Sequence, residues 1–557
     1  MKKQLLFWSV CITTILSANA QTSVWDGSHT TWTKGTGTLT NPYLIENAAQ
    51  LAHLAYVVNN GIGAGGERIV GTDTYWKLMT NINLNGSESF QWTPIGYYTS
   101  DADYFAFGGN FDGNGKTISN LFINTATLQM IGLFGYAEGA SIKGIGIEGN
   151  KKISSESAYA GGIVGCGDNL TIADCYNTNT ISGIKAGGIV GKVWSGTISN
   201  CYNTDSISSY NNSSSISSDP MSGGIVGHGA PIIDNCYNTG NISSELFYAK
   251  YSNESFSGGI VGVGSPKINN CYNTGNISSK SSQNIYYSST NTYSNSGGII
   301  GSGNPTINNC FNAGKISSKS TSGGHSYSTS GGIVGEMHDS RTINNCYNTG
   351  IIYSYSSDSY SGGIVGHRPS LWGSSIISAI NNCYNVGNVE TINGTYQGGI
   401  LGSGYTPQIS VNNSYYITTC GSKNTYGEWK TGIFMKTTEF VNLLNNGQDL
   451  SFKADYTESI NKGFPILIWQ SNQPSGIEEV KVNNTLTLYP NPVNDIFFIE
   501  YKNYDMVKIY DMLGKEVLSQ NTNVIKEINI KHLSQGIYHV LVLSGGKIIG
   551  NSKIVKR

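Results

Sequence analysis

Charged residues are scarce in this sequence, and their scarcity argues against binding to nucleic acid or to an anionic membrane. Asp, Glu, Lys and Arg make up 12% of the 557 residues, against about 25% in an ordinary soluble protein. The 33 basic and 35 acidic residues nearly cancel, so no positive excess points to nucleic acid or to an anionic membrane. Gly (71) and Tyr (35) are abundant instead, as in a turn-rich β protein with a polar surface.

Motifs for catalysis and metal binding are also missing. There are eight His residues, and neither a His-Glu-x-x-His zinc motif nor a Gly-x-Ser-x-Gly nucleophile motif occurs. Asp112, in Phe-Asp-Gly-Asn-Gly, lacks the closing acid of a calcium loop, so we interpret it as a turn residue. The repeat region is poor in acids, and its aspartates share no single repeat position: Asp168, Asp174, Asp205, Asp219 and Asp234. We therefore expect no metal, no cofactor and no catalytic residue.

Long apolar runs are confined to the first twenty residues. Lys2 and Lys3 precede an apolar stretch that ends before Ala18-Asn19-Ala20, the pattern of a secretory signal peptide cleaved after Ala20. No other segment reaches the roughly 20 apolar residues of a membrane span. The sequence predicts an exported protein without a transmembrane segment.

A repeat occupies the middle of the chain. A Gly-Gly-Ile-Val/Ile/Leu-Gly cassette begins at residues 161, 187, 223, 258, 297, 331, 362 and 398. A segment ending in Cys-Tyr-Asn, once Cys-Phe-Asn, follows each of the first seven cassettes, and Ser414 replaces the cysteine after the eighth. Repeats of this length form solenoids, whose units bury their apolar faces against their neighbours.

Each repeat predicts three short strands: the cassette, the segment through Cys-Tyr-Asn, and a brief Ile-x-Ser segment. Alternation along the second strand places the cysteine inward, the next Tyr outward and the following Asn inward. Because parallel crossovers are nearly always right-handed, we expect an all-β fold, a right-handed parallel β-helix. Most of the length variation follows the cysteine strand, so the insertions should stack on one side.

The repeated cysteines have two interpretations. An exported protein can form disulfides, but the cysteine slot holds Leu121 and Ile145 in two less regular upstream repeats, which indicates a core position. Stacked side chains also lie about 4.8 Å apart, whereas a disulfide needs Cβ atoms about 3.8 Å apart. We expect a structural core ladder of Cys175, Cys201, Cys236, Cys271, Cys310, Cys346 and Cys383.

Two capping helices and six regions are expected. Apolar residues recur at helical spacing from Ala48 to Val58, and a second short helix should span residues 437–447, ending at Gly447. The predicted regions are the signal peptide (1–20), an N-terminal cap with irregular rungs (21–130), the repeat β-helix (131–420), a C-terminal cap segment (421–473), a linker (474–484) and a terminal domain (485–557).

Several segments resemble GLUG-motif proteins of bacterial cell surfaces. They are Gly37-Thr-Leu-Thr-Asn-Pro-Tyr-Leu-Ile45, Trp92-Thr-Pro-Ile-Gly96, Phe111-Asp-Gly-Asn-Gly115, Ile131-Gly-Leu-Phe-Gly135, the repeats, and Gly463-Phe-Pro-Ile-Leu-Ile-Trp469. The resemblance implies a β-helical stalk on exported proteins, often adhesins, and no single activity.

The last seventy residues resemble the C-terminal sorting domain of type IX secretion. The matching segments are Leu488-Tyr-Pro-Asn-Pro492, Val507-Lys-Ile-Tyr-Asp-Met-Leu-Gly514, Leu533-Ser-Gln-Gly-Ile-Tyr538 and the basic end at Lys553–Arg557. This resemblance implies a small Ig-like β-sandwich, the type IX secretion machinery as a partner, and the outer surface of a member of the Bacteroidota.

Two sets of aromatic residues are candidates for ligand binding. The Ser-, Tyr- and Asn-rich insertions have the composition of antibody combining loops, or they are solvated hairpins that extend the sheet; their candidates are Tyr248, Tyr251, Tyr286, Tyr287, Tyr293, Tyr327, Tyr355 and Tyr360. The second set is the outward column, whose rings could stack on sugars or only stabilise the sheet: Tyr176, Tyr202, Tyr237, Tyr272, Phe311, Tyr347 and Tyr384.

These observations predict an exported cell-surface protein that binds rather than catalyses, adhesin-like, with a glycan or a host or matrix surface as its ligand. The alternatives are a polysaccharide-active lyase or glycosidase, which an acidic cluster across several rungs would favour, and a purely structural surface component.

Overall fold

The computed structural model describes residues 22–63, 65, 67–212, 218–247, 253–282, 291–321, 325–338, 341–369, 378–394, 396–404, 409–424, 426–447, 450–472, 487–500, 505–510, 516–521, 527–544 and 547–557. The chain divides into two compact units, Met1–Ile468 and Trp469–Arg557. The predicted signal peptide with Ala20, the linker 474–484, and Tyr248, Tyr251, Tyr286 and Tyr287 lie outside the described residues.

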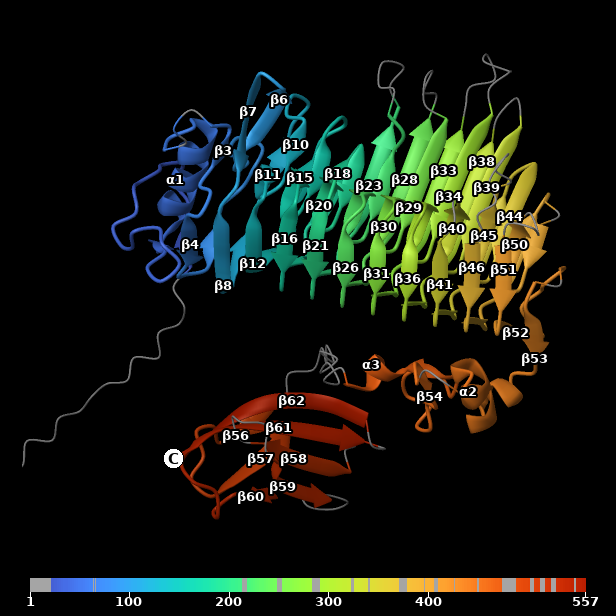
Figure 1. Ribbon diagram of the computed structural model, residues 1–557. Coiled ribbons are helices and arrows are strands. Elements are labelled where there is room, and N and C mark those ends of the chain that lie inside the picture. The colour runs from blue at the N-terminus through green and yellow to red at the C-terminus, as the bar shows by residue number, and fades with distance from the viewer. Residues whose placement is uncertain are drawn as a thin grey trace, which may run out of the picture. The chain divides into compact units, whose positions relative to one another are not determined.

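The first unit is a parallel β-solenoid of about ten turns, so the predicted parallel β-helix is confirmed. Figure 1 shows its rungs stacked side by side. Each regular rung contains five short strands rather than the predicted three, because the cassette and the cysteine segment each split in two. The strands pair in register with the next rung and build four sheets, named here for a residue of the repeat.

Two sheets flank the corner of the Gly-Gly cassette. The glycine sheet contains β10 (Met130–Ile131), β14 (Tyr159–Gly161), β19 (Lys185–Gly187), β24 (Met221–Gly223), β29 (Glu254–Gly258), β34 (Thr292–Gly297), β39 (Ser326–Gly331), β44 (Asp358–Gly362) and β49 (Tyr396–Gly398). The valine sheet contains β3 (Ile69–Val70), β7 (Asp103–Phe107), β11 (Phe134–Glu138), β15 (Val164–Asp168), β20 (Val190–Val193), β25 (Val226–Gly229), β30 (Val261–Gly264), β35 (Ile300–Gly303), β40 (Val334–Met337), β45 (Val365–Arg368) and β50 (Leu401–Gly404), with β6 (Tyr97–Ser100) beside β7.

The other two sheets complete the turn. The cysteine sheet contains β1 (Ser23–Val24), β2 (Tyr43–Ile45), β4 (Tyr75–Leu78), β5 (Ile82–Asn83), β8 (Asn110–Ser119), β12 (Ser141–Glu148), β16 (Leu170–Ala173), β17 (Tyr176–Asn177), β21 (Gly196–Ser199), β22 (Tyr202–Asn203), β26 (Ile232–Asp234), β27 (Tyr237–Asn238), β31 (Lys267–Asn269), β32 (Tyr272–Asn273), β36 (Thr306–Asn308), β37 (Phe311–Asn312), β41 (Thr342–Asn344), β42 (Tyr347–Asn348), β46 (Ser378–Asn381), β47 (Tyr384–Asn385), β51 (Ile409–Asn412), β52 (Tyr415–Ile417) and β53 (Glu428–Lys430). The serine sheet contains β9 (Ile123–Asn124), β13 (Lys152–Ser154), β18 (Thr180–Gly183), β23 (Ile207–Asn211), β28 (Ile242–Phe247), β33 (Ile277–Ser282), β38 (Ile316–Thr321), β43 (Ile352–Tyr355) and β48 (Val389–Ile392).

The residue before each cysteine breaks the predicted second strand. Asn235 and Asn270 both have φ of 53°, in the left-handed region that Asn tolerates better than most residues. The chain turns there, so β26 ends before the cysteine and β27 begins after it. The cassette splits after its first glycine, where β29 ends and before β30 begins. Only glycine fits at the second position, because a Cβ on Gly259 would lie 2.0 Å from the Gly298 carbonyl oxygen and 2.6 Å from Asn273 Cβ.

The two ends of the solenoid are covered differently. At the N-terminal end α1 (Ala48–Asn59) is present as predicted, with the Asn47 side chain capping Gln50 N–H and Leu51 and Leu54 buried. At the other end a loop around residues 418–428 crosses the last rung, where Asn424 Nδ2 donates to the carbonyls of Leu401 (2.7 Å) and Gly402 (3.0 Å). The last strands are therefore capped by side chains of a loop.

The predicted helix at 437–447 is present as α2 (Thr438–Asn445), but it lies against the side of the cysteine sheet. The segment also contains η2 (Phe434–Lys436), the antiparallel pair β54 (Phe452–Lys453) and β55 (Ile466–Leu467), and the start of α3 (Ile468–Asn472). Phe440 of α2 packs against the rings of Tyr384 and Tyr415, with centroids 6.1 and 5.4 Å apart.

The second unit contains two antiparallel sheets that share one hydrophobic core, as expected for a small β-sandwich. One sheet consists of β56 (Thr487–Tyr489), β57 (Ile496–Glu500) and β60 (Glu527–Asn529), and the other of β59 (Glu516–Asn521), β58 (Met506–Tyr510), β61 (Gly536–Ser544) and β62 (Lys547–Lys556). Phe497, Val507 and Val540 are fully buried between them.

Candidate functional site

The insertions lengthen the strands of the serine and glycine sheets and press the two sheets together. Serine hydroxyls meet in the space between them, for example Ser244 with Ser257 at 2.8 Å and Ser318 with Ser330 at 2.7 Å, and all four are buried. The described serines of this region therefore hold the two sheets together. The side chains left to meet a ligand are those on the outer faces.

Three predicted tyrosines lie together on the outer face of the glycine sheet. The rings of Tyr293 and Tyr327 stack with centroids 4.9 Å apart. Tyr360 stacks on Tyr396 at 4.7 Å and on His367, from the neighbouring valine sheet, at 4.2 Å. Tyr355 is separate from them, because it lies on the serine sheet with Lys319 Nζ 4.9 Å from its ring.

A second column of side chains runs on the same side of the solenoid, on the valine sheet. Five members of the two columns are at most 5% exposed, namely Cys166, Phe256, Asn295, Ser302 and Thr329. Together the two columns, with Glu254, Tyr293 and Tyr327 two residues before the glycine-sheet column on β29, β34 and β39, form what we call the corner face. The glycine-sheet column is Tyr159, Lys185, Met221, Phe256, Asn295, Thr329, Tyr360 and Tyr396. The valine-sheet column is Cys166, Lys192, His228, Val263, Ser302, Glu336, His367 and Ser403.

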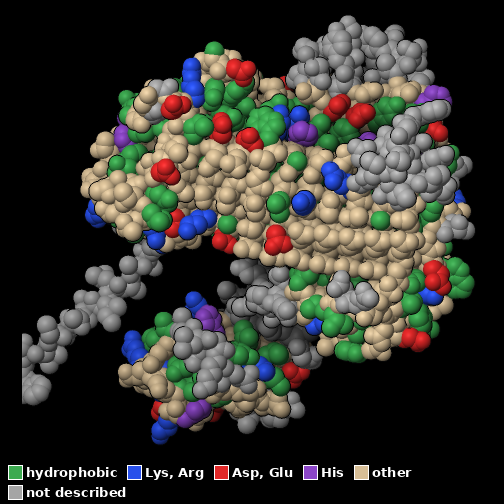
Figure 2. All heavy atoms as spheres, viewed as in Figure 1, with side chains coloured by type: hydrophobic (Ala, Val, Ile, Leu, Met, Phe, Trp, Pro, Cys, Tyr) green, Lys and Arg blue, Asp and Glu red, His purple; other side chains and the backbone are tan. Residues whose placement is uncertain are grey.

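Contacts across the corner join the two columns. Lys192 Nζ lies 5.2 Å from the ring centroid of Tyr159, and Asn295 Nδ2 donates to Glu336 Oε2 at 2.7 Å. In Figure 2 a band of hydrophobic, charged and histidine side chains runs along the upper side of the solenoid, above a flank that is mostly tan. In a chain with so little charge, this gathering marks the corner face as the candidate site.

Four acids and histidines of the corner face have shifted pKa values: Glu254, Glu336, His228 and His367. Burial, and then the carboxylates of Asp219 and Glu336, raise the pKa of Glu254 to about 7. Burial also raises the pKa of Glu336, which the ring of His338 and the amide of Asn295 oppose. Burial lowers the pKa of His228 and of His367 to about 4, so both imidazoles are neutral at pH 7.

Sequence reasoning missed the ionisable residues of this face, although their repeat positions were visible. Lys192, His228, Glu336 and His367 each directly follow a Gly-Gly-Ile-Val-Gly cassette, and Lys185 stands two residues before one. Polar residues that vary from repeat to repeat, next to a motif that recurs in every repeat, are the sequence signal of this face. Aligning the repeats on the cassette, and not on the cysteine, would have revealed these residues.

The predicted aromatic column is present, but one end of it is covered. Neighbouring rings from Tyr176 to Tyr384 stack 4.9–5.0 Å apart and within 8° of parallel. Tyr347 and Tyr384 are 1% and 0% exposed, because the segment that carries α2 packs over this end of the column; Tyr384 donates its hydroxyl proton to the Pro465 carbonyl. These two rings offer no surface to a ligand.

The repeated cysteines are free thiols with no exposed surface. Each Sγ donates to the carbonyl two residues earlier, as from Cys271 to Asn269 at 3.0 Å, and the N–H of Cys201 donates to Cys236 Sγ at 3.4 Å. Burial raises the pKa of six of the seven ladder thiols well above its usual value, for example in Cys175, Cys236 and Cys271. In Cys346 burial is outweighed by hydrogen bonds with Cys310 and Cys383, which lower its pKa. The other six are protonated interior groups.

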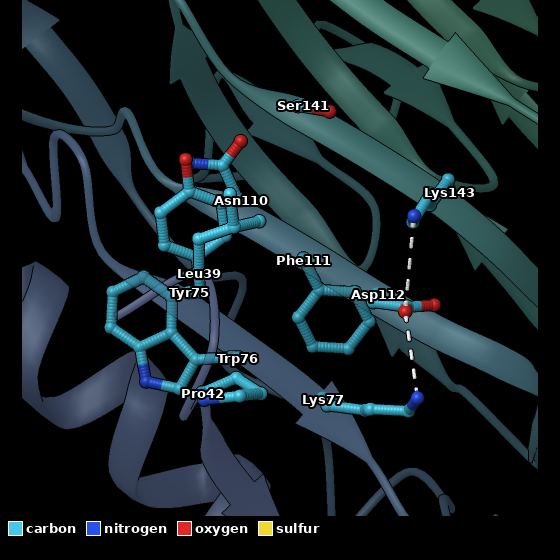
Figure 3. A pocket seen from close by; sticks show the side chains of 10 residues that line it. All are labelled: Leu39, Pro42, Tyr75, Trp76, Lys77, Asn110, Phe111, Asp112, Ser141 and Lys143. Carbon is cyan, nitrogen blue, oxygen red and sulfur yellow. Dashed lines mark ion pairs between the residues drawn. The ribbon is translucent and has the colours of Figure 1, made fainter. Parts of the chain in front are cut away.

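A hollow of about 280 Å³ lies on the cysteine sheet near its N-terminal end. Figure 3 shows Asp112 at its edge between Lys77 and Lys143, whose Nζ atoms lie 4.0 and 3.9 Å from Asp112 Oδ2. Asp112 Oδ1 accepts the N–H of Asn114 at 2.8 Å, as in a turn. The acid is thus engaged by neighbours from adjacent strands.

Over the described ranges, no three His, Cys, Asp or Glu side chains are placed to hold a metal ion. Within the same ranges no helix is long and apolar enough to cross a membrane.

Comparison with known proteins identifies the second unit. Residues 487–557 match the family described as the secretion system C-terminal sorting domain. The chain carries a type IX secretion sorting domain. The sorting domain is handled by the type IX secretion system and directs export to the cell surface or beyond it.

Two relatives match parts of the chain, each over 30% of its length. Halomucin of Haloquadratum walsbyi is 28% identical over 181 residues, which cover 30% of this chain and 2% of halomucin. A protein of Evansella cellulosilytica described as a Gly-rich membrane protein is 31% identical over 171 residues, covering 30% of this chain and 17% of that protein. The chain thus spans a small part of either relative.

One solved structure aligns more widely but loosely. It is a Bacteroides ovatus protein described as an immunoglobulin A1 protease, with 18% identity, a TM-score of 0.33, and coverage of 79% of this chain and 95% of that one. A TM-score this low carries no functional conclusion.

Proposed function

We propose that this exported protein is an adhesin-like surface protein that binds an extended glycan along the corner face. The observation that carries the proposal is the pairing of two side-chain columns over eight rungs, in which accessible aromatic rings (Tyr159, Tyr360 and Tyr396) lie beside half-buried polar groups such as Lys192 and His228. Aromatic rings present flat apolar surfaces to sugar rings, and neutral histidines and buried carboxyl groups can exchange hydrogen bonds with hydroxyls. The sequence resemblance to GLUG-motif proteins of bacterial cell surfaces supports the same proposal.

The test is a glycan-binding array with the full chain, one triple variant and one double variant. Tyr293→Ala, Tyr327→Ala and Tyr360→Ala together should weaken saturable binding roughly tenfold or more, since each lost ring contact is worth about 0.5–1.5 kcal/mol. Tyr353→Ala with Tyr355→Ala, on the serine sheet of the same insertions, is the matched control and should bind as the parent does. Equal binding by all three proteins would disprove a site on the corner face.

A second candidate, a polysaccharide-active enzyme, is favoured by one observation. The structure brings Asp219 and Glu254 into neighbouring rungs, with Glu254 N–H donating to Asp219 Oδ1 at 3.2 Å, and gives Glu254 a pKa near 7. A protonated carboxyl beside an ionised one is what acid-assisted cleavage of a glycosidic bond requires. Shortened saccharides released from the array by the parent but not by Glu254→Gln would favour the enzyme.

A further inference from the structure

Two lysines stand side by side near the N-terminal end of the corner face. Lys185 on β19 and Lys192 on β20 belong to the same rung, and their Nζ atoms lie 5.3 and 5.2 Å from the ring centroid of Tyr159 in the rung before. Lys192 Nζ also lies 4.3 Å from the ring of Trp194. Three different strands therefore place two ammonium groups over aromatic surfaces.

Neither ammonium group has an acidic partner at ion-pair distance among the described residues. The ion pairs found there involve Lys34, Lys77, Lys143, Lys280, Lys430 and Lys556, together with His325. Burial, and then the Lys192 ammonium, lower the pKa of Lys185; Asp219 opposes this shift from the next rung. Two like charges held close in a half-buried position are unfavourable until an anion joins them.

The residues around the two lysines provide an apolar surface and a polar atom without a hydrogen-bond partner. Trp194 is 47% exposed, so its indole presents a flat face beside Lys192. His228 follows Lys192 in register on the next rung, and its Nδ1 is buried without a hydrogen-bond partner. Cation, aromatic plane and imidazole are the groups with which proteins hold an acidic sugar.

We infer that this cluster is a subsite for an anionic sugar, with a carboxylate or sulfate group bound between Lys185 and Lys192 and the sugar ring on Trp194. The inference rests on the proposed glycan binding of the corner face and specifies its ligand as an acidic polysaccharide. A nucleic acid fits less well, because the chain has no positive excess to neutralise a run of phosphates: its 33 basic residues are balanced by 35 acidic ones.

Isothermal titration of the full chain with four probes tests the subsite. The probes are heparin-derived oligosaccharides, oligogalacturonate, neutral cello-oligosaccharides and a thymidine oligonucleotide. The parent should bind at least one acidic saccharide about tenfold or more tightly than the neutral one. Lys185→Met with Lys192→Met should abolish that preference, and Trp194→Ala should weaken both saccharide classes. The heparin and galacturonate arms distinguish sulfate from carboxylate.

The matched control removes two exposed lysines that lie outside the corner face, Lys267→Met with Lys315→Met, and should keep the preference for acidic saccharide. Thermal unfolding checks the fold, and the Lys185/Lys192 variant should be no less stable than the parent because it loses a repulsion. Equal affinity of the parent for acidic and neutral saccharides would overturn the subsite while the proposed function stood. Tightest binding of the oligonucleotide would overturn it too, and no saccharide binding at all would defeat both proposals.

Discussion

Asparagine occurs at up to three positions of a repeat, and it has a different structural role at each. Asn235 adopts the left-handed turn before the cysteine. Asn238 points inward, donating to the Gly240 carbonyl at 2.7 Å and to Asn273 Oδ1 at 2.8 Å. Asn269 points outward and accepts from Asn308 at 2.9 Å. Because an amide both donates and accepts, each position can be repeated from rung to rung without leaving a buried group unpaired.

Glu254 gives the corner face a pH-dependent stability. Its pKa, near 7 in the folded chain, lies above that of an unfolded glutamate, so the folded state keeps a proton that the unfolded state loses from about pH 4.5 upward. Stability therefore falls as pH rises towards 7 and stays low above it. Glu254→Gln should remove this fall and stabilise the protein at pH 8 by up to about 3 kcal/mol, with little effect at pH 4.

Thermal unfolding at pH 4 and pH 8 measures the difference, with the exposed Glu390→Gln as the control. A gain of a few degrees at pH 8 that is absent at pH 4, and absent in the control, is the expected result. If Glu254→Gln unfolds at the parent's temperature at both values of pH, the buried carboxyl group is not protonated as described.

At the scale of the element, the strands are too short to be stable alone. β17, β22 and β27 contain two residues each, and such strands persist only because identical strands flank them on both sides. Sequence alternation predicted three strands per repeat where the structure has five. Alternation shows which side chains point inward, but it continues unchanged through a left-handed asparagine. The strand break at that residue is therefore not visible in the sequence pattern.

The segment that covers the end of the aromatic column is expected to be a local unit of stability. Phe440 of α2 is fully buried against Tyr384 and Tyr415, and truncating a buried Phe costs about 3–5 kcal/mol. Phe440→Ala should therefore speed hydrogen exchange in α2 and β52 by two orders of magnitude or more, while β22 to β37 exchange as in the parent.

Mass spectrometry of amide exchange measures this effect, with the half-buried Phe434→Ala as a milder control. Uniform acceleration along the whole solenoid would show instead that the segment and the rungs unfold as one.

For the whole molecule, equivalent residues of neighbouring rungs pair with one another, so we expect the protein to fold after one complete rung is removed. Ile233 pairs with Ile268 and Tyr237 with Tyr272, so excision of residues 236–270 would join Asn235 to Cys271 with every column in register. The shortened chain should fold with a melting temperature within a few degrees of the parent's, because each rung contacts only its neighbours.

Excision of residues 236–269 is the control, since the one residue left over shifts the side chains to the opposite face. Circular dichroism and thermal unfolding compare the two proteins. Equal melting temperatures for both deletions would contradict a register set by the columns.

Sequence periodicity was sufficient for the solenoid, the inward cysteines and the sorting domain, because each depends on a pattern that repeats or on a contiguous motif. The corner face depends on residues that vary between repeats, such as Lys192, His228 and Glu336, and on the angle at which two sheets meet. The chain turns at the second glycine of the cassette, where no side chain would fit, and a one-dimensional pattern does not encode the angle of that turn.

The direction of the ladders has a mechanical consequence. The backbone hydrogen bonds between rungs, the asparagine amides and the stacked rings all run along the solenoid axis, so tension along that axis would load them one after another. A rung at the end would give way first and release about 35 residues, or roughly 120 Å of chain, before the next was loaded. A molecule built this way would dissipate shear in steps, lengthening while the remaining rungs stayed folded.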